Sequence, residues 1–389
     1  MSSPRTALTG AAILWEGRLQ HGKALLLEGG QIAGLADAAA LPPGTAAEDL
    51  GGGTLAPGFV DLQVNGGGGV MFNDAPEAAT LRTMAEAHAR IGATTILPTL
   101  ITDTPQQTAR AIEAAAEAVR LGIPGIAGLH LEGPHLAPAR KGAHDASLIR
   151  PMGEDDLQLL LNAAERLPVL KVTLAPESAT CEQIARLAGA GVLVSLGHTN
   201  ADYAACAAAA GAGVACVTHL FNAQSQMGNR EPGTVGAALA LGQLSAGLIA
   251  DGVHVHPANV ATALRAKQGP GEIFLVSDAM ATAGSEISSF QLNGREIRRS
   301  GNRLTLADGT LAGAHLELAD AVRLLVQDCG DPLEAALARA TRIPARLAGL
   351  PEAGWLAAGR PTDLVHLDAG LALTAVWQSG HRMTGSPAR

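Results

Sequence analysis

The sequence is poor in cysteine and has no excess of basic residues, and both shortages exclude classes of protein. Its 389 residues include four cysteines, none in a C-x-x-C pair: Cys181, Cys206, Cys216 and Cys329. Because four separated thiols cannot frame so long a chain, we expect buried, reduced cysteines and no disulfides. The formal net charge is −9, without a long basic run. Such a chain is not attracted to nucleic acid or to an anionic membrane surface.

Long apolar segments and targeting signals are also lacking. No stretch reaches the ~18 uninterrupted apolar residues of a membrane-spanning helix, and MSSPRTALTG at the N-terminus lacks a charged region followed by an apolar one. We therefore expect a cytoplasmic protein that uses no membrane. The glycine runs at 51–53 and 66–69 lack the Gly-Lys-Ser/Thr ending of a phosphate loop, which excludes nucleotide binding. With 47% hydrophobic residues, the chain can bury a large core.

Eight apolar, strand-like runs alternate with Ala-rich helical stretches through the middle of the chain. They are FVDLQV, TTILPTL, IAGLHLEG, LKVTLAPE, VLVSLGH, ACVTHLFN, AGLIADGVH and EIFLVSD. Each run can be buried on both faces, which is typical of the parallel strands of a (β/α)8 barrel. An open, doubly wound sheet is the alternative. The barrel is favoured because almost every run ends in a polar side chain, and barrel enzymes place their chemistry at the carboxyl ends of their strands.

Short apolar runs broken by glycine and polar residues occupy the start of the chain and return near its end. They indicate a small antiparallel β unit that cannot hold a core alone, so we expect the two ends to pair. The sequence thus predicts a small β domain from residues 1–54 and 355–389, and a catalytic barrel domain from residues 55–354.

The segment 284–308 breaks the alternation of strands and helices. Its alternating residues and its Asn-Gly pair predict a β-hairpin inserted after the eighth strand. The segment carries four arginines: Arg295, Arg298, Arg299 and Arg303. We interpret them as a solvated face of the hairpin, with the steering of an anionic substrate as the alternative.

Four polar residues at the ends of predicted strands form a pattern typical of a catalytic metal site. Glu132, His198 and His219 are residue types that bind first-row metals, and Asp278 adds a carboxylate. His198 and His219 lie 21 residues apart, one βα unit, so adjacent strands should carry them. Three protein ligands with an open fourth position are the geometry of catalytic zinc. Each histidine alone is more simply a hydrogen-bonded loop residue, but the four together favour a metal site.

Eight segments resemble the sequence blocks of one known enzyme family, in that family's order. They are PGFVDLQVNGGGG, GLHLEGPHLAPARKGAH, KVTLAPE, SLGHTNA, THLFNAQSQMGNREPGTVGA, IADGVHVHPAN, VSDAMATAG and GTLAGAHLELADAV. Over nearly its whole length the chain is similar to the N-acetylglucosamine-6-phosphate deacetylases of the amidohydrolase superfamily. The resemblance implies a distorted barrel with a small β domain built from both termini. It also implies removal of the acetyl group from N-acetylglucosamine 6-phosphate, in amino-sugar catabolism and cell-wall amino-sugar recycling.

The resemblance assigns roles to the candidate metal and catalytic residues. Glu132, His198 and His219 match the metal ligands, and Asp278 matches the catalytic carboxylate. A carboxylate there can take a proton from water and give it to the departing amine, a poor leaving group unless protonated. His144 matches a position near the scissile amide, where an N–H donor would stabilise the oxyanion. The alternative for His144 is a histidine that anchors its loop.

Other matched positions imply how the substrate is held. Arg230 and His254 match the family's phosphate-binding positions, and arginine suits the task because its planar fork reaches two phosphate oxygens. The alternative for Arg230 is an ordinary surface or dimer-interface salt bridge. Contacts to the sugar are implied for Ala143, Asn222, Ala223, Leu311, Ala312 and Gly313. The family further implies a homodimer, in which Arg230 acts within its own chain or across the interface.

The first strand departs from the pattern of the amidohydrolase superfamily. That strand commonly ends in His-x-His, which holds one metal of a pair, whereas this chain carries Gln63-Val64-Asn65. Amides are weaker zinc ligands than imidazoles, so the first metal position should be nearly empty. We therefore expect one divalent ion per chain, Zn²⁺ in the first place, with Fe²⁺, Co²⁺ or Mn²⁺ as alternatives. Gln63 and Asn65 would then bond to water in the site or pack beneath it.

Three other functions stay open at this point. The enzyme would use N-acetylgalactosamine 6-phosphate if its site accepted the other epimer at C4, or a non-phosphorylated amide if Arg230 and His254 formed no phosphate site. A catalytically dead barrel acting as a scaffold is the third, and the intact set of Asp278 and three metal-ligand types argues against it.

Overall fold

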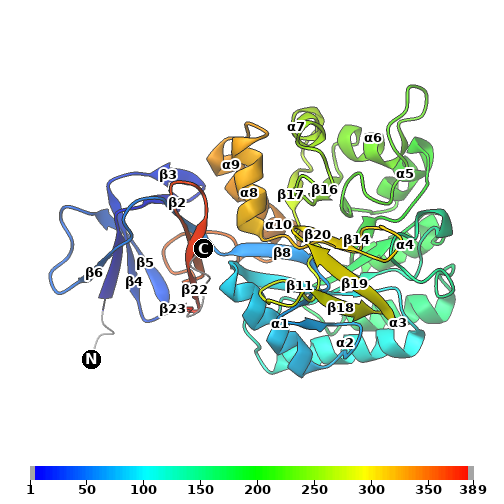
Figure 1. Ribbon diagram of the computed structural model, residues 1–389, viewed down its shortest axis with the longest axis horizontal. Helices are drawn as coiled ribbons and strands as arrows, with labels where there is room; N and C mark the ends of the chain where they lie inside the picture. Colours follow the sequence, from blue (N-terminus) through cyan, green and yellow to red (C-terminus); the bar gives the residue numbers. More distant parts are fainter. Residues whose placement is uncertain (1–4, 384–389) are drawn as a thin grey trace.

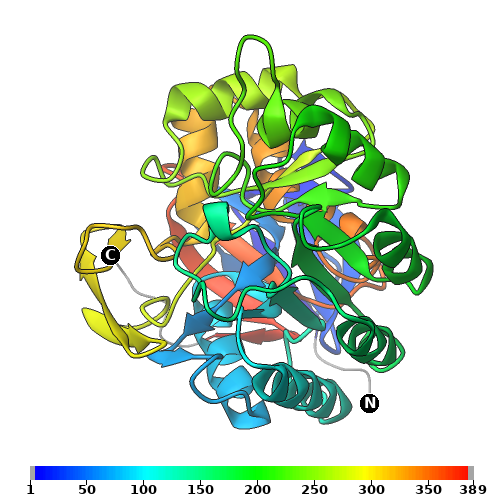
Figure 2. The same ribbon diagram turned by 90° about the vertical axis from the view of Figure 1, so that its right-hand side faces the viewer.

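The computed structural model describes residues 5–383, which are built around eight parallel strands (Figures 1 and 2). Residues 1–4 and 384–389, the outer ends of the two predicted terminal segments, lie outside the described part. The eight strands are β8 (Phe59–Val64), β11 (Ala93–Ile101), β12 (Leu129–Glu132), β13 (Leu170–Leu174), β14 (Leu193–Leu196), β15 (Cys216–Val217), β16 (Ser245–Leu248) and β17 (Ile273–Leu275). They are paired in simple sequence order, which confirms the barrel and excludes a doubly wound sheet, whose strand order reverses.

The barrel is nearly closed between its last strand and its first. Val64 forms a parallel bridge with Ala279, and the Asp278 N–H donates to the carbonyl of Gln63 over 3.1 Å. The buried carboxylate of Asp61 spans the same seam, because it accepts the backbone N–H of Gln63 at 3.1 Å and that of Ser277 at 3.2 Å. The Asp61 side chain thus links the first strand to the segment that follows the last strand, β17.

Helices surround the barrel strands (Figure 2). They are α1 (Ala78–Arg90), α2 (Pro105–Arg120), α3 (Glu154–Ala164), α4 (Cys181–Gly189), α5 (Tyr203–Gly211), α6 (Gly233–Ala240), α7 (Pro257–Ala266), α8 (Leu318–Gln327), α9 (Leu333–Ala340) and α10 (Arg342–Leu347). Local sequence starts some of them: Thr180 and Gln183 form a reciprocal capping box at α4. None of the helices within residues 5–383 is long and apolar enough to cross a membrane.

Two sheets built from the ends of the chain lie beside the barrel, at the left of Figure 1. The four-stranded sheet has the order β5 (Gln31–Asp37), β4 (Lys23–Glu28), β1 (Arg5–Thr9), β6 (Ala46–Asp49). The six-stranded sheet has the order β23 (His381–Arg382), β22 (Leu373–Gln378), β21 (Leu364–Leu367), β7 (Thr54–Pro57), β2 (Ala12–Trp15), β3 (Arg18–Gln20). C-terminal β21 pairs with N-terminal β7, so the two ends join as expected.

Two details differ from the sequence-based expectations. The pairs β1–β6 and β2–β7 are parallel, because the intervening chain crosses over before it returns, so the terminal unit is not purely antiparallel. All four cysteines are free, as expected, and Cys206 and Cys216 are buried. Cys181 is exposed, because it opens the surface helix α4 on the side that faces water, so its predicted burial is wrong.

The segment after β17 forms an antiparallel sheet of three strands, drawn in yellow in Figures 1 and 2. Its strands are β18 (Ser289–Leu292), β19 (Arg295–Ser300) and β20 (Arg303–Thr305). Asn293 and Gly294 have φ values of +50° and +72°, as the two central residues of a tight hairpin turn require. A shorter hairpin, β9 (Gly66–Gly67) and β10 (Val70–Met71), follows β8 in the glycine run.

Candidate active site

The predicted metal and catalytic residues all lie at the carboxyl end of the barrel. Glu132 is the last residue of β12, and His198 and His219 come two residues after β14 and β15. Asp278 follows β17 by three residues. His198, His219 and Asp278 have φ values of +47°, +31° and +52°, a backbone region that such residues adopt at a cost of about 1–3 kcal/mol each. Local strain of this kind is typical of residues whose placement serves a site.

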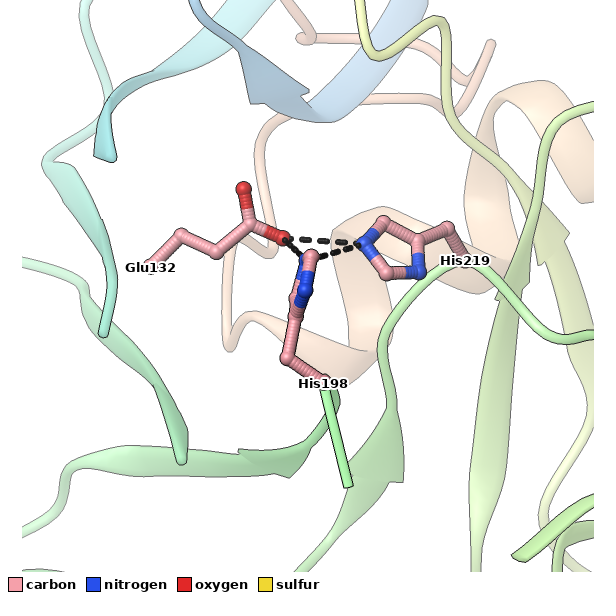
Figure 3. Close-up of side chains that lie close together, drawn as sticks. All are labelled: Glu132, His198 and His219. Carbon is pink, nitrogen blue, oxygen red and sulfur yellow. Dashed lines mark hydrogen bonds and ion pairs between the residues drawn. The ribbon is translucent and has the colours of Figure 1, made fainter. Parts of the chain in front are cut away.

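Glu132, His198 and His219 bring three ligand atoms to one point (Figure 3). Glu132 Oε1 lies 3.0 Å from His219 Nε2 and 3.4 Å from His198 Nε2, and the two Nε2 atoms lie 3.1 Å apart. Two imidazole nitrogens and a carboxylate oxygen form a donor set that suits a first-row divalent ion. A shared ion would also accommodate two nitrogen lone pairs that face each other so closely. The residues present therefore fit a metal.

Hydrogen bonds prepare two of these groups to act as ligands. His198 Nδ1 lies 2.8 Å from the carbonyl oxygen of Arg140, so Nδ1 carries the proton and Nε2 keeps its lone pair. Burial alone would raise the pKa of Glu132, but the adjoining imidazoles of His198 and His219 outweigh it and hold the pKa well below its usual range. The carboxylate is thus ionised, as a metal ligand must be.

Asp278 is held by two amides from the first strand. Its Oδ1 accepts a hydrogen bond from Asn65 Nδ2 at 2.7 Å and another from Gln63 Nε2 at 3.1 Å. Gln63 Nε2 also lies 3.1 Å from Glu132 Oε1, so one amide joins the ligand to the second carboxylate. Burial and repulsion from Glu132 raise the pKa of Asp278. Because both amides donate to Oδ1, neither occupies Oδ2.

His144 lies against the metal-ligand cluster in the neutral form. Its Nδ1 accepts the backbone N–H of Thr102 at 3.3 Å and lies 2.8 Å from the Thr102 hydroxyl. Nε2 points the other way, 3.9 Å from Glu132 Oε2. Burial, with the nearby His198, lowers the pKa of His144 to about 3. With Nδ1 as acceptor, the ring carries its proton on Nε2, toward the cluster.

A cavity of about 270 Å³ opens over these groups. Glu132, His198, His219, Asp278 and Asn65 line it. So do seven of the residues predicted to contact substrate or stabilise the oxyanion: Ala143, His144, Asn222, Ala223, His254, Leu311 and Gly313. Ala312 and Gln63 are buried outside the lining. No lysine or arginine of residues 5–383 lines the cavity, so the lining supplies no permanent positive charge for an anionic ligand.

One of the two predicted phosphate residues borders the cavity, and the other does not. His254 borders the cavity, and its Nδ1 lies 2.7 Å from Asp251 Oδ2. Asp251 also accepts the backbone N–H groups of Val253 and His254, so the ring is fixed with Nε2 available. Arg230 lies in the exposed loop between β15 and α6, outside the cavity lining.

Several residues that shape the site carried no signal in the sequence. Leu292 and Thr310, from the inserted sheet and the loop after it, line the cavity. Arg295 donates to the carbonyl of Ala143, so this arginine braces a cavity loop and is half-buried, unlike the exposed Arg303. The expected solvated face is therefore wrong for Arg295, because the insertion folds over the site. Only the three-dimensional path of the segment shows this.

A barrel that gathers a carboxylate, two imidazoles and a second carboxylate at its carboxyl end defines a metal-dependent hydrolase. The chain belongs to the amidohydrolase family, whose sequence model matches residues 54–383.

Known relatives narrow the comparison to one group of enzymes. The chain is 42% identical to the N-acetylgalactosamine-6-phosphate deacetylase of Shewanella sp. (strain ANA-3), over 95% of this chain and 94% of the relative. It is 37% identical to the human N-acetylglucosamine-6-phosphate deacetylase, over 85% and 84% of the two chains. The resemblance to amino-sugar 6-phosphate deacetylases is thereby confirmed.

Solved structures agree with the sequence comparison. The N-acetylglucosamine-6-phosphate deacetylase of Pasteurella multocida superposes with a TM-score of 0.92 at 32% identity, over 98% of this chain and 100% of that chain. A mutant of the Mycobacterium smegmatis enzyme, solved in complex with N-acetyl-D-glucosamine-6-phosphate, gives a TM-score of 0.89 at 35% identity, over 98% and 99%. The likeness covers the barrel and the terminal sheets together.

Proposed function

We propose that the protein removes the acetyl group from N-acetyl-D-glucosamine 6-phosphate and yields D-glucosamine 6-phosphate and acetate. The observation that carries this proposal is the convergence of Glu132, His198 and His219 beside Asp278, whose Oδ1 is anchored by two amides. The names of the relatives support this substrate. One relative is named for N-acetylgalactosamine 6-phosphate and another for N-acetylglucosamine 6-phosphate, and both compounds are N-acetylated hexosamine 6-phosphates. We propose a cytoplasmic enzyme, in keeping with four cysteines that are all free.

One divalent ion per chain is proposed at Glu132, His198 and His219, with Zn²⁺ first and Fe²⁺, Co²⁺ or Mn²⁺ as alternatives. When bound, such an ion supplies a Lewis acid that polarises the amide carbonyl and makes water more acidic. The two amides at the end of β8 favour a single ion, because amide oxygens are weaker metal ligands than imidazole nitrogens, and the amide nitrogens donate to Asp278 and Glu132. Within residues 5–383, no other group of three His, Cys, Asp or Glu side chains could hold a metal ion.

The chain's own residues account for the proton transfers. Asp278 Oδ2 takes a proton from the attacking water as the new C–O bond forms at the acetyl carbon. His144 Nε2–H donates to the carbonyl oxygen while negative charge develops there. Asp278 then delivers its proton to the amide nitrogen, the C–N bond breaks, and the free amine leaves together with acetic acid, which gives its remaining proton to water and becomes acetate. The raised pKa of Asp278 suits a group that must both accept and release a proton.

The phosphate requires positive charge that the cavity lining does not supply. His254 offers a hydrogen-bond donor, but its partner Asp251 carries the opposite charge. Arg230 lies in an exposed loop that also presents Met227, 57% exposed, so both residues are available to a second copy of the chain. We therefore propose a homodimer in which Arg230 of one chain completes the phosphate site of the other. Movement of the loop within one chain is the alternative.

Contacts to the sugar are proposed for the remaining lining residues. Asn222 offers a side-chain amide, and Ala223, whose φ is +50°, lines the cavity beside it. Ala143 and the segment from Leu311 through Ala312 to Gly313 would add backbone groups from two other loops. Backbone donors and acceptors on several loops can fix the ring without long, flexible side chains.

N-acetylgalactosamine 6-phosphate is the second candidate substrate. The observation in its favour is that the Shewanella relative, at 42% identity, is named for that substrate, whereas the human relative at 37% is named for the glucosamine form. The two sugars differ at C4 alone, so one polar contact can decide between them.

Acetate release from both sugar phosphates and from their unphosphorylated forms tests the proposal. Protein of measured metal content should hydrolyse at least one phosphorylated sugar, with kcat/KM well above that for its unphosphorylated form. Faster hydrolysis of the unphosphorylated amides would point to another amidohydrolase activity. No acetate from any of the four by metal-loaded protein would contradict the proposed function.

A further inference from the structure

The two residues that follow His198 are held by a carboxylate from a neighbouring loop. Glu177, between β13 and α4, accepts the hydroxyl of Thr199 through Oε2 and the backbone N–H of Asn200 through Oε1, each at 2.7 Å. Thr199 Oγ1 in turn accepts the N–H of Ala201 at 3.0 Å. The sequence block KVTLAPE therefore reaches the turn that carries His198, and none of the chemistry derived so far uses it.

The loop between β12 and α3 also forms hydrogen bonds with this turn. Arg140 Nε donates to Asn200 Oδ1 at 2.9 Å, and the carbonyl of Arg140 accepts the proton of His198 Nδ1 at 2.8 Å. Ala137 N–H donates to the carbonyl of His198 at 2.9 Å. His198, Arg140 and Asn200 thus form a closed ring of contacts, with Glu177 fixing the chain between the two ends.

This ring sets the direction of the His198 imidazole. The Arg140 carbonyl is the group that holds the Nδ1 proton, so the position of Arg140 decides where Nε2 points. Asn200 fixes the Arg140 side chain, and Glu177 fixes Asn200. His198 also has a φ value of +47°, which a free turn would tend to relax.

We propose that Arg140, Asn200 and Glu177 act as positioning residues for His198 and thereby determine how tightly the site holds its divalent ion. The inference rests on the proposed metal site at Glu132, His198 and His219. It assigns a function to side chains that are exposed or half-exposed and do not line the cavity. Groups that orient a metal-binding histidine through its other nitrogen typically change metal affinity 10- to 100-fold when removed.

An ordinary surface network is the competing account of these contacts. Exposed polar and charged pairs contribute little to stability. A purely structural role therefore predicts small effects of these substitutions on both metal affinity and thermal unfolding. The proposal predicts instead a selective effect on metal affinity, while the thermal unfolding of the metal-free protein stays near wild type. Metal affinity, measured apart from catalysis, is therefore the decisive quantity.

The experiment measures the Kd of Zn²⁺ for metal-free protein by competition with a chromophoric chelator. Arg140→Ala and Asn200→Ala should each weaken zinc binding at least ~10-fold, and Glu177→Gln should weaken it in the same direction. Because the first two changes remove the same bond, the double variant should lose little more than either single variant. Asn200→Asp keeps an oxygen acceptor for Arg140 and should restore most of the affinity.

Three remote exposed residues of the same types serve as matched controls. Arg166 pairs with Glu113 at 2.5 Å, and Asn162 accepts from Gln158 at 2.8 Å. Arg166→Ala, Glu113→Gln and Asn162→Ala should leave the Kd of Zn²⁺ unchanged. Wild-type affinity in Arg140→Ala and Asn200→Ala would overturn the positioning role alone. Failure of the wild-type protein to bind Zn²⁺ would overturn the metal site, and this inference with it.

Discussion

Asn65 donates its side-chain amide to Asp278 Oδ1 over 2.7 Å, across the seam where the barrel closes. Gln63 donates to the same oxygen at 3.1 Å, so the two amides of the first strand hold a carboxylate. Other amidohydrolases commonly carry His-x-His at the end of this strand. A histidine that binds a metal there would present a nitrogen lone pair, whereas Asn65 and Gln63 present N–H donors. The amides thus orient Asp278, and that of Gln63 also donates to Glu132.

Removal of the Asn65 amide should lower kcat while the metal content stays the same. In Asn65→Ala, Asp278 loses its shorter anchoring bond, and a misplaced proton acceptor can cost up to ~10²-fold in rate. Steady-state kinetics and metal analysis of the same preparation check this. Loss of metal with unchanged turnover per bound ion would show that Asn65 supports the ion and not Asp278.

The change Asp278→Asn tests the proton-transfer role directly. It preserves the shape of the side chain but removes the proton acceptor, so kcat should fall by at least the ~10² typical of general acid–base catalysis. Bound metal should stay near the wild-type amount, because Glu132, His198 and His219 are unchanged. Full activity would discard the mechanism, and loss of metal would make Asp278 mainly a ligand.

Arg230→Ala should raise KM for the phosphorylated sugar roughly 10- to 100-fold, the value of a hydrogen bond to a charged group. Activity on the unphosphorylated sugar should hardly change, because the lost contact lies far from the acetamido group. Arg166→Ala, another exposed arginine, is the control. Equal losses on both substrates would refute the phosphate role.

Mixing two variants distinguishes an Arg230 that acts across a dimer interface from one that acts within its own chain. If the arginine acts across a dimer interface, mixing Arg230→Ala chains, which bind the sugar phosphate weakly, with inactive Asp278→Asn chains should form hybrid dimers with one complete site, which is assayed at a low concentration of the sugar phosphate. Restored hydrolysis of the sugar phosphate is then expected. No recovery in mixtures that demonstrably exchange chains would place Arg230 within its own chain.

The buried Asp61 should make stability depend on pH. Burial raises its pKa from the ordinary 3.8 to about 7, against the hydrogen bonds from Ser277 and Gln63. Between these values the folded protein holds a proton that the unfolded chain releases, so this contribution to stability is full below pH ~4 and is lost as the pH rises toward ~7. Two ionisable side chains interact electrostatically with the Asp61 carboxylate: Asp278, which helps to raise its pKa, and Lys171.

Denaturant unfolding of the wild type and Asp61→Asn at pH 5 and pH 8 measures this effect. The amide cannot ionise, so relative to the variant the wild type should lose up to ~3 kcal/mol of unfolding free energy between the two pH values. A difference between the two proteins that does not change with pH would contradict the raised pKa of Asp61.

Much of the barrel was predictable because parallel strands buried on both faces leave continuous apolar runs. All eight predicted runs became barrel strands, and the polar residues at their ends met at one face because the strands are parallel. The 21-residue interval did place His198 and His219 on adjacent strands. The division into two domains at residues 54/55 and 354/355 stays a prediction, and β7 runs across the first of these points.

What the sequence could not supply are relationships set by the path of loops. Nothing in the pattern around Arg295 marks the carbonyl of Ala143 as its partner, since 152 positions separate them. Amide side chains in a strand likewise give no sign of which carboxylate they will face, so Asn65 and Asp278 had to be seen together. The exposed position of Arg230, outside its own chain's cavity, is a further consequence of loop geometry.

A titration of metal-free protein with Zn²⁺, followed by acetate release from N-acetylglucosamine 6-phosphate, tests the central claim most directly. We expect activity to rise in proportion to added zinc and to level off at one ion per chain, because within residues 5–383 only Glu132, His198 and His219 form a complete ligand set. Gln63→Ala should leave that endpoint at one. An endpoint at two ions per chain that falls to one in Gln63→Ala, or no acetate release at any zinc level, would contradict a single-metal deacetylase.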